Sequence, residues 1–206
     1  MSILSDNQII NMINNGFIGI EPLIKNNIQP SSVDLTLSDQ IEIVTTKDSI
    51  DLGSLAENAH EFIKRQTISD DGYSLEPNSY VIGFSAEIIS LTTGFNGRIC
   101  NKNSLIRWGL DVSLGSFINP GFKGRMPLII RNIGQTTLIL RAGIKICQLE
   151  IHQLDTPSTR NYENRHDPDV LISDIPEWEK KLQQDNKNLD RSFSEFLHQR
   201  IIANSK

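Results

Sequence analysis

A group of polar side chains stands in the middle of the sequence, in the stretch NKNSLIRWGL at residues 101–110. It places Lys102, Asn103, Ser104 and Arg107 in a short turn-like segment between two apolar runs. Lysine and arginine supply positive charge, while serine, asparagine and backbone N–H groups supply hydrogen-bond donors. Together these groups can hold a polyphosphate. An ordinary exposed turn is the competing interpretation of the same residues.

A second stretch, INPGFKGRMPLIIRN at residues 118–132, has the form of an active-site strand without an acid. It contains a tight turn, an aromatic residue and an apolar run that ends in Arg131 and Asn132, but no Asp or Glu. Hydrolytic chemistry needs a group that takes a proton from water. The sequence therefore leaves open whether the protein transforms a ligand here or only holds it.

Other reaction types find little support. Zinc deaminases need a His or Cys ligand with a nearby Glu, and then two cysteines separated by two residues. Cys100 and Cys147 lie far apart, and the histidines fit no ligand spacing, so we expect no zinc site. Neither the G-x-S-x-G motif of hydrolases nor a glycine-rich nucleotide-binding loop is present.

The elements that must position these residues are mostly strands. From Tyr73 to Leu154 the chain is a succession of short β-type runs separated by Gly, Asn and Pro turns, which is typical of a β-barrel or sandwich. Residues 28–44 alternate with the strand period. Residues 5–16, SDNQIINMINNG, begin with a capping residue and end in Asn-Gly, and so predict an N-terminal helix.

The pattern of polarity predicts three segments. Residues 1–155 form the β-domain, with a polar excursion at residues 45–72. Residues 156–175 are polar and form a C-terminal arm. Residues 176–206 have apolar residues roughly along one helical face, and so predict an amphipathic helical extension.

The composition excludes several classes of partner. The 206 residues carry a formal net charge of −5, which argues against binding of a nucleic-acid polymer. No apolar run approaches the roughly 18 residues that a membrane helix needs. The N-terminus has no signal-peptide pattern, and two cysteines form no disulfide framework. We therefore expect a cytoplasmic protein without membrane contact.

In their order along the chain, these motifs resemble the dCTP deaminase family of the dUTPase-like superfamily. The similarity covers roughly residues 3–154, from ILSDNQI through IQPSSVDLTL and the stretches above to LRAGIKICQLEI. It implies a distorted dUTPase-like β-barrel that assembles as a homotrimer with nucleotide sites between subunits. With the helices expected at the two ends, the fold class is mainly β, with an N-terminal helix and a C-terminal helical extension.

The resemblance assigns the polar segment to the nucleotide. KNSLIR at residues 102–107 matches the family's R-S-S-L-A-R, which implies that Lys102, Asn103, Ser104 and Arg107 hold the triphosphate of dCTP or dUTP. Lys102 keeps the charge of an arginine but lacks its two-pronged geometry.

Three further positions match residues around the nucleotide. Gln148, in ICQLE, matches a phosphate-contacting glutamine, and Tyr162 matches the tyrosine of an arm that closes over the nucleotide. Asp34, in SSVDLTL, matches an aspartate that in dUTPases helps to hold the Mg²⁺–triphosphate, so Mg²⁺ is the expected cofactor, held indirectly. The alternative for Asp34 is a polar strand residue satisfied by the backbone.

The family's catalytic carboxylates are missing. The deaminases have Leu-Glu-x-x-Asn after the turn, and the position of that general acid–base Glu falls on Ile129. The water-activating Asp of the dUTPases falls on Asn119, whose amide does not accept a proton at neutral pH. Asp111 lies close in sequence and is a candidate substitute base, or else a solvent-facing strand residue.

Three functions are compatible with the sequence. The first is a dCTP deaminase-like enzyme, converting dCTP to dUTP, with rearranged catalytic groups. The second is an inactive family member that binds or senses nucleotides or regulates a partner. The third is a trimeric scaffold whose C-terminal helix recruits a partner.

Overall fold

The computed structural model describes residues 2–45, 49–50, 62–115, 117–160 and 162. The helical extension expected at residues 176–206 lies outside the described residues, as does most of the arm expected at residues 156–175.

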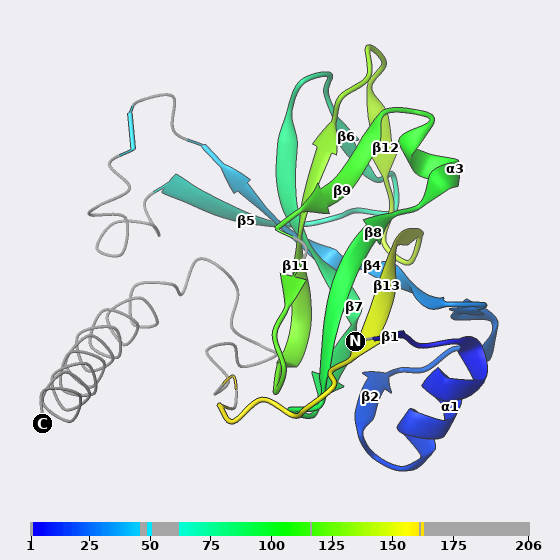
Figure 1. The fold of residues 1–206 in the computed structure, drawn as a ribbon. Helices are drawn as coiled ribbons and strands as arrows, with labels where there is room; N and C mark the ends of the chain where they lie inside the picture. Colours follow the sequence, from blue (N-terminus) through cyan, green and yellow to red (C-terminus); the bar gives the residue numbers. More distant parts are fainter. Residues whose placement is uncertain (1, 46–48, 51–61, 116, 161, 163–206) are drawn as a thin grey trace, which may run out of the picture.

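The described part of the chain is built mainly of strands (Figure 1). The helices are α1 (Asp6–Asn14), the 3-10 turn η1 (Lys25–Asn27) and α3 (Asn103–Ile106). The strands are β1 (Ser2–Ile3), β2 (Ile18–Glu21), β3 (Ile28–Gln29), β4 (Ser32–Val44), β5 (Ile63–Thr67), β6 (Tyr73–Leu75), β7 (Tyr80–Leu91), β8 (Phe95–Asn101), β9 (Leu110–Leu114), β10 (Phe117–Ile118), β11 (Lys123–Asn132), β12 (Leu138–Leu140) and β13 (Lys145–Gln153).

The strands pair in a curled antiparallel sheet, which confirms the mainly β fold. Its main path runs β10-β8-β13-β4-β7-β11-β9, with four short strands added at its sides, while β12 and β6 form a separate pair. The long strands β4, β7 and β11 cross the middle of the molecule (Figure 1). Neighbours in sequence are often not neighbours in the sheet, so the order β8-β13-β4 brings distant segments together.

The core lies on the concave side of this sheet. Successive residues of a strand point to opposite faces, and β11 shows the pattern clearly. Met126, Leu128 and Ile130 are buried, whereas Ile129 between them is half-buried on the outer face. Removal of such apolar surface from water is the main driving force for this fold.

Helix α1 begins and ends where the sequence predicted. The backbone N–H of Ser5 donates to the side-chain Oε1 of Gln8 at 2.9 Å, which is half of a capping box. Ile9 is fully buried against the sheet. The helix stops at Asn14, and Gly16 follows with a φ of +74°, a conformation that glycine adopts at no steric cost.

A side chain joins the two edges of the curled sheet. Asn101, at the end of β8, donates from Nδ2 to Asp111 Oδ1 at 2.8 Å, and its Oδ1 accepts from the Val112 backbone N–H at 2.7 Å. Strands β8 and β9 stand near opposite ends of the pairing order. Asn101 and Asp111 therefore help to close the barrel.

Within the described residues, no helix has the length and apolar character that crossing a membrane requires.

The turn that follows α3 depends on Gly109. Its φ is +88°, and a Cβ built on it would lie 2.6 Å from the backbone nitrogen of Gly134. Gly143 has a similar φ of +79° but open space around its Cβ position. Both glycines therefore need a positive φ, but only Gly109 has backbone atoms too close to the position of a Cβ.

We predict that Gly109→Ala lowers the free energy of unfolding by about 2 kcal/mol or more, because backbone strain and a steric clash act together. Gly143→Ala is the matched control and should lose about 1 kcal/mol, from the backbone alone. Urea unfolding of both variants measures the difference. Equal losses would mean that Gly109 tolerates a side chain sterically.

Candidate functional site

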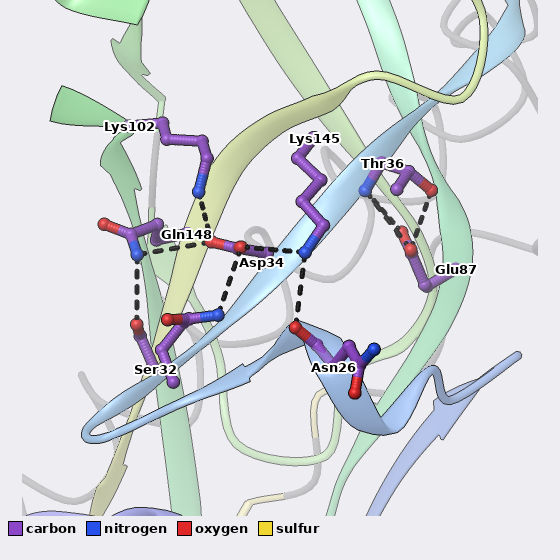
Figure 2. Close-up of polar contacts among 9 residues, drawn as sticks. Asn26, Ser32, Asp34, Thr36, Glu87, Lys102, Lys145 and Gln148 are labelled. Atoms are coloured by element: carbon purple, nitrogen blue, oxygen red, sulfur yellow. Dashed lines mark hydrogen bonds and ion pairs between the residues drawn. The ribbon is translucent and has the colours of Figure 1, made fainter. Parts of the chain in front are cut away.

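A buried carboxylate, Asp34, organises a polar network on the outer face of the sheet (Figure 2). Asp34 is 2% exposed. Its Oδ1 accepts from Lys102 Nζ at 2.8 Å and from Gln148 Nε2 at 3.3 Å. Its Oδ2 accepts from Gln29 Nε2 at 3.3 Å and lies 3.4 Å from Lys145 Nζ. Each of the two carboxylate oxygens therefore has one ammonium group and one side-chain amide as neighbours.

Three strands place these groups. Residues of β4 alternate, so Val33 and Leu35 point into the core while Asp34 points to the opposite face. Gln148 of β13 pairs in register with Asp34 of β4. It also pairs with Cys100 of β8, so the end of β8 brings Lys102 alongside.

The sequence analysis did not identify two members of the network, Lys145 and Gln29, as candidate site residues. Residues three apart normally lie on opposite faces of a strand. A register shift between Lys145 and Cys147 lets Lys145 and Gln148 share the face of Asp34. The sequence contains this lysine in IKICQ, but not the irregularity that turns it toward Asp34.

Helix α3 carries the rest of the predicted phosphate segment. Lys102 precedes the helix, and its carbonyl oxygen accepts from the backbone N–H groups of Leu105 and Ile106 at 2.8 and 3.0 Å. Asn103, Ser104 and Arg107 are exposed on this single turn. The structure thus brings together Lys102, Gln148 and Asp34, and leaves the other three polar residues facing solvent beside them.

Ile129 occupies an outward position in the middle of β11. It pairs in register with Ile82 of β7 and Leu114 of β9. Its side chain is half-buried and apolar, so this position offers no proton donor or acceptor.

Asp111 shares the neighbourhood of Arg131, its register partner on β11, but its carboxylate is already engaged. Oδ1 accepts from Asn101 Nδ2 at 2.8 Å, from the Ser113 backbone N–H at 3.0 Å and from Ser113 Oγ at 2.7 Å. Partial burial by itself would raise the pKa of Asp111, but these bonds and Arg131 hold it below its ordinary value. A carboxylate with a lowered pKa is a weaker base.

Asn119 and Tyr162 lie toward the opposite end of β8 from Lys102. Ile118 pairs with Gly97, and the Tyr162 backbone N–H donates to the Pro120 carbonyl oxygen at 3.1 Å. A strand rises about 3.3 Å per residue, so Gly97 and Lys102 are separated by about 16 Å along β8. One copy of the chain therefore does not bring these two sets of residues together.

A cavity of about 510 Å³ lies at this second end. The rings of Phe122 and Tyr162 approach each other there, with centroids 6.2 Å apart. Its lining residues are Gly16, Phe17, Ser90, Leu91, Thr92, Thr93, Gly121, Phe122, Lys123 and Tyr162. The cavity combines aromatic faces with hydroxyl groups and one cation.

Asp34 does not fit a directly bound divalent cation. Mg²⁺ takes oxygen ligands at about 2.1 Å in octahedral geometry. Both oxygens of Asp34 already have an ammonium group as a neighbour, from Lys102 and Lys145. Within the described ranges, no group of three or more His, Cys, Asp or Glu residues is arranged to hold a metal ion.

We predict that Asp111 stabilises the fold above pH ~4 and loses this effect in acid. A carboxyl whose pKa is lowered by folding stabilises the protein above its unfolded pKa of about 3.9, and the effect disappears as the pH falls through the folded value. Asp111→Asn should therefore lose less stability than the unmutated protein as the pH falls from about 5 to about 2, measured by urea unfolding. An unchanged slope would contradict a role of this charge in closing the barrel.

Comparison with known proteins places these observations in a family context. The sequence model described as dCTP deaminase-like matches residues 3–154. The "dCTP deaminase, dUMP-forming" of Methanobrevibacter smithii is 31% identical over 167 residues, which cover 79% of this chain and 86% of that protein. The protein of the same description from Mycobacterium marinum is 34% identical over 163 residues, covering 78% and 85% respectively.

A solved structure supports the fold. The 2'-deoxycytidine 5'-triphosphate deaminase of Agrobacterium tumefaciens superimposes with a TM-score of 0.58 and 21% sequence identity, over 72% of this chain. The matched part spans 47% of that longer chain.

Proposed function

The chain belongs to the dCTP deaminase-like family, and from that premise we propose that it binds a pyrimidine deoxynucleoside triphosphate, dCTP or dUTP, while the family's catalytic step is altered or absent. Such a protein would act in cytoplasmic pyrimidine deoxynucleotide metabolism, as a nucleotide sensor, a store of bound nucleotide or a regulator of a partner.

The phosphate side of this proposal rests on the network around Asp34. Lys102 and Gln148 are already turned toward one point by the same carboxylate. Ser104 and Arg107 stand exposed on the adjoining turn of α3. Charge-assisted hydrogen bonds from such groups are the interactions that hold phosphate oxygens in proteins.

The remaining part of the site would come from a neighbouring copy. Gly97, the register partner of Ile118, is about 16 Å from Lys102 along β8, so Asn119 and Lys102 lie toward opposite ends of this strand. A homotrimer with a nucleotide between subunits, as the family resemblance implies, would join the two ends. We propose that the chain forms such a homotrimer.

The single observation that carries the loss of chemistry is the apolar Ile129 on the outer face of β11. Deamination without zinc needs one group that deprotonates water and protonates the departing ammonia. Isoleucine does neither, and Asn119 carries an amide where a carboxylate would activate water.

Mg²⁺ belongs to the proposal as an ion that arrives with the triphosphate. A bound Mg²⁺ would neutralise and orient the phosphate oxygens. The chain's own contribution is the placement of Lys102, Arg107 and Gln148 around the phosphates, with Asp34 holding two of these side chains.

An active enzyme is the second candidate function. The curated relatives that share 31% and 34% identity bear the name dCTP deaminase, dUMP-forming. If this chain shares that activity, a residue other than Ile129 and Asn119 must act as the general base that deprotonates water. Asp111 is the first to test, although its oxygen already accepts three hydrogen bonds.

We predict that dCTP and dUTP remain unchanged after overnight incubation with the protein and Mg²⁺, as followed by chromatography. Appearance of dUTP or dUMP would overturn the loss of chemistry. Asp111→Asn would then show whether Asp111 is the substitute base, because the amide keeps its size and removes its basicity.

We also predict that dCTP or dUTP raises the melting temperature, and that Ser104→Ala with Arg107→Ala abolishes the rise. A ligand that binds only the folded state stabilises it, by an amount that grows with the logarithm of the ligand concentration divided by Kd. An exposed cation far from α3, replaced in Lys64→Gln, serves as the control and should leave the shift intact. No shift in the unmutated protein would favour the scaffold function.

A third prediction concerns the missing acids. Ile129→Glu combined with Asn119→Asp restores both carboxylates, so any surviving site geometry should yield measurable dUTP or dUMP by the same chromatography. Continued inactivity, despite an intact thermal shift with nucleotide, would mean that the surrounding groups no longer support the reaction.

A further inference from the structure

Lys145 belongs to the network around Asp34 although no motif assigns it a role. Its ammonium lies 3.4 Å from Asp34 Oδ2 and donates to the Asn26 carbonyl oxygen at 3.3 Å. Lys102 and Lys145 therefore contact different carboxylate oxygens of Asp34 (Figure 2). One buried carboxylate therefore holds two cations a short distance apart.

The two lysines of this network are partly exposed, whereas its acid is buried. The side chains of Lys102 and Lys145 are 23% and 39% exposed, whereas Asp34 is 2% exposed. The lysines are therefore the charged side chains of this network that solvent reaches. Gln148, half-buried beside them, adds an amide donor.

Glu87 is another buried acid in this part of the sheet, and its carboxylate accepts hydrogen bonds from Thr36 instead of from the two lysines. It is 2% exposed. Its oxygens accept from the Thr36 backbone N–H at 3.0 and 3.2 Å and from Thr36 Oγ1 at 2.8 Å. The two lysines have their ion pairs with Asp34, and their side chains remain partly exposed.

We propose that Lys102 and Lys145 form a two-ammonium anchor for a phosphate group of the bound nucleotide, with Asp34 as their buried counter-ion and not as a metal ligand. The carboxylate fixes the spacing of the two cations in advance, which lowers the entropy lost when phosphate binds. At the proposed phosphate site, the two lysines supply the positive charge that a protein-bound divalent ion would otherwise supply.

This inference deepens the proposed function, because it adds Lys145 and a division of charges to the same phosphate site. Mg²⁺ that arrives on the triphosphate needs no contact with Asp34.

The test measures binding of inorganic tripolyphosphate, and separately of dCTP and dUTP, by calorimetry on the full chain in EDTA. Lys145→Gln should weaken tripolyphosphate binding by about tenfold, the usual effect of one lost charge-assisted contact. Lys145→Arg should restore most of the affinity. Lys64→Gln, an equal change of net charge on the exposed face of β5, is the matched control and should have little effect.

A second arm tests the role of Asp34. Asp34→Asn should leave the affinity gained on adding Mg²⁺ the same as in the unmutated protein. Loss of that gain would show that Asp34 serves the metal, and would overturn the proposal. Thermal unfolding of each variant checks that the fold persists.

The outcomes separate the anchor from the nucleotide function. If tripolyphosphate binds through Lys145 but dCTP and dUTP do not, the anchor stands and the proposed function fails. If Lys145→Gln leaves tripolyphosphate affinity unchanged, or if the unmutated protein does not bind tripolyphosphate, the anchor is wrong.

Discussion

The buried carboxylate of Asp34 is the constraint on which the candidate site depends. A charge that is removed from water needs paired charges and hydrogen bonds around it. Here two lysines and two glutamines meet that need, and they come from the β3–β4 hairpin, the end of β8 and the first half of β13. Satisfying one acid thus fixes the relative positions of segments that are more than a hundred residues apart at the extremes.

A second polar contact closes the barrel near the same place. Asn101 ends β8 and reaches across to β9, where it bonds Asp111 and Val112. Because Lys102 follows directly, the geometry of the phosphate segment depends on this closure. Asp111 therefore has a structural role that accounts for its three hydrogen bonds, and its lowered pKa follows from that role and not from preparation of a base.

The fold separates Lys102 and Gln148 from the cavity lined by Phe122 and Tyr162. Both sets of residues lie on or beside β8, but at opposite ends of it. An antiparallel strand is stiff and extended, so its length sets a minimum distance between its ends. Assembly of several copies is the way in which a chain with this arrangement can build one site from both ends.

The sequence by itself determined the features that arise locally. The strand alternation of residues 28–44 predicted β4, in which Asp34 faces away from Val33 and Leu35, and the capping residues predicted α1 within a residue or two. The resemblance to the family predicted the barrel and singled out Lys102, Gln148 and Asp34, which the structure brings into contact. The missing acids at Ile129 and Asn119 were equally visible, because they are matters of residue type.

Only the tertiary structure decided how non-local partners share a charge. The sequence left Asp34 between a metal-assisting role and a strand residue satisfied by the backbone, whereas the structure surrounds it with lysine and glutamine side chains. The irregularity between Lys145 and Cys147, and the curl that brings β8 to β9, follow from packing of the whole sheet. Periodicity reports which face a side chain takes, but the neighbours on that face are set by strand order and register, which no local stretch of sequence contains.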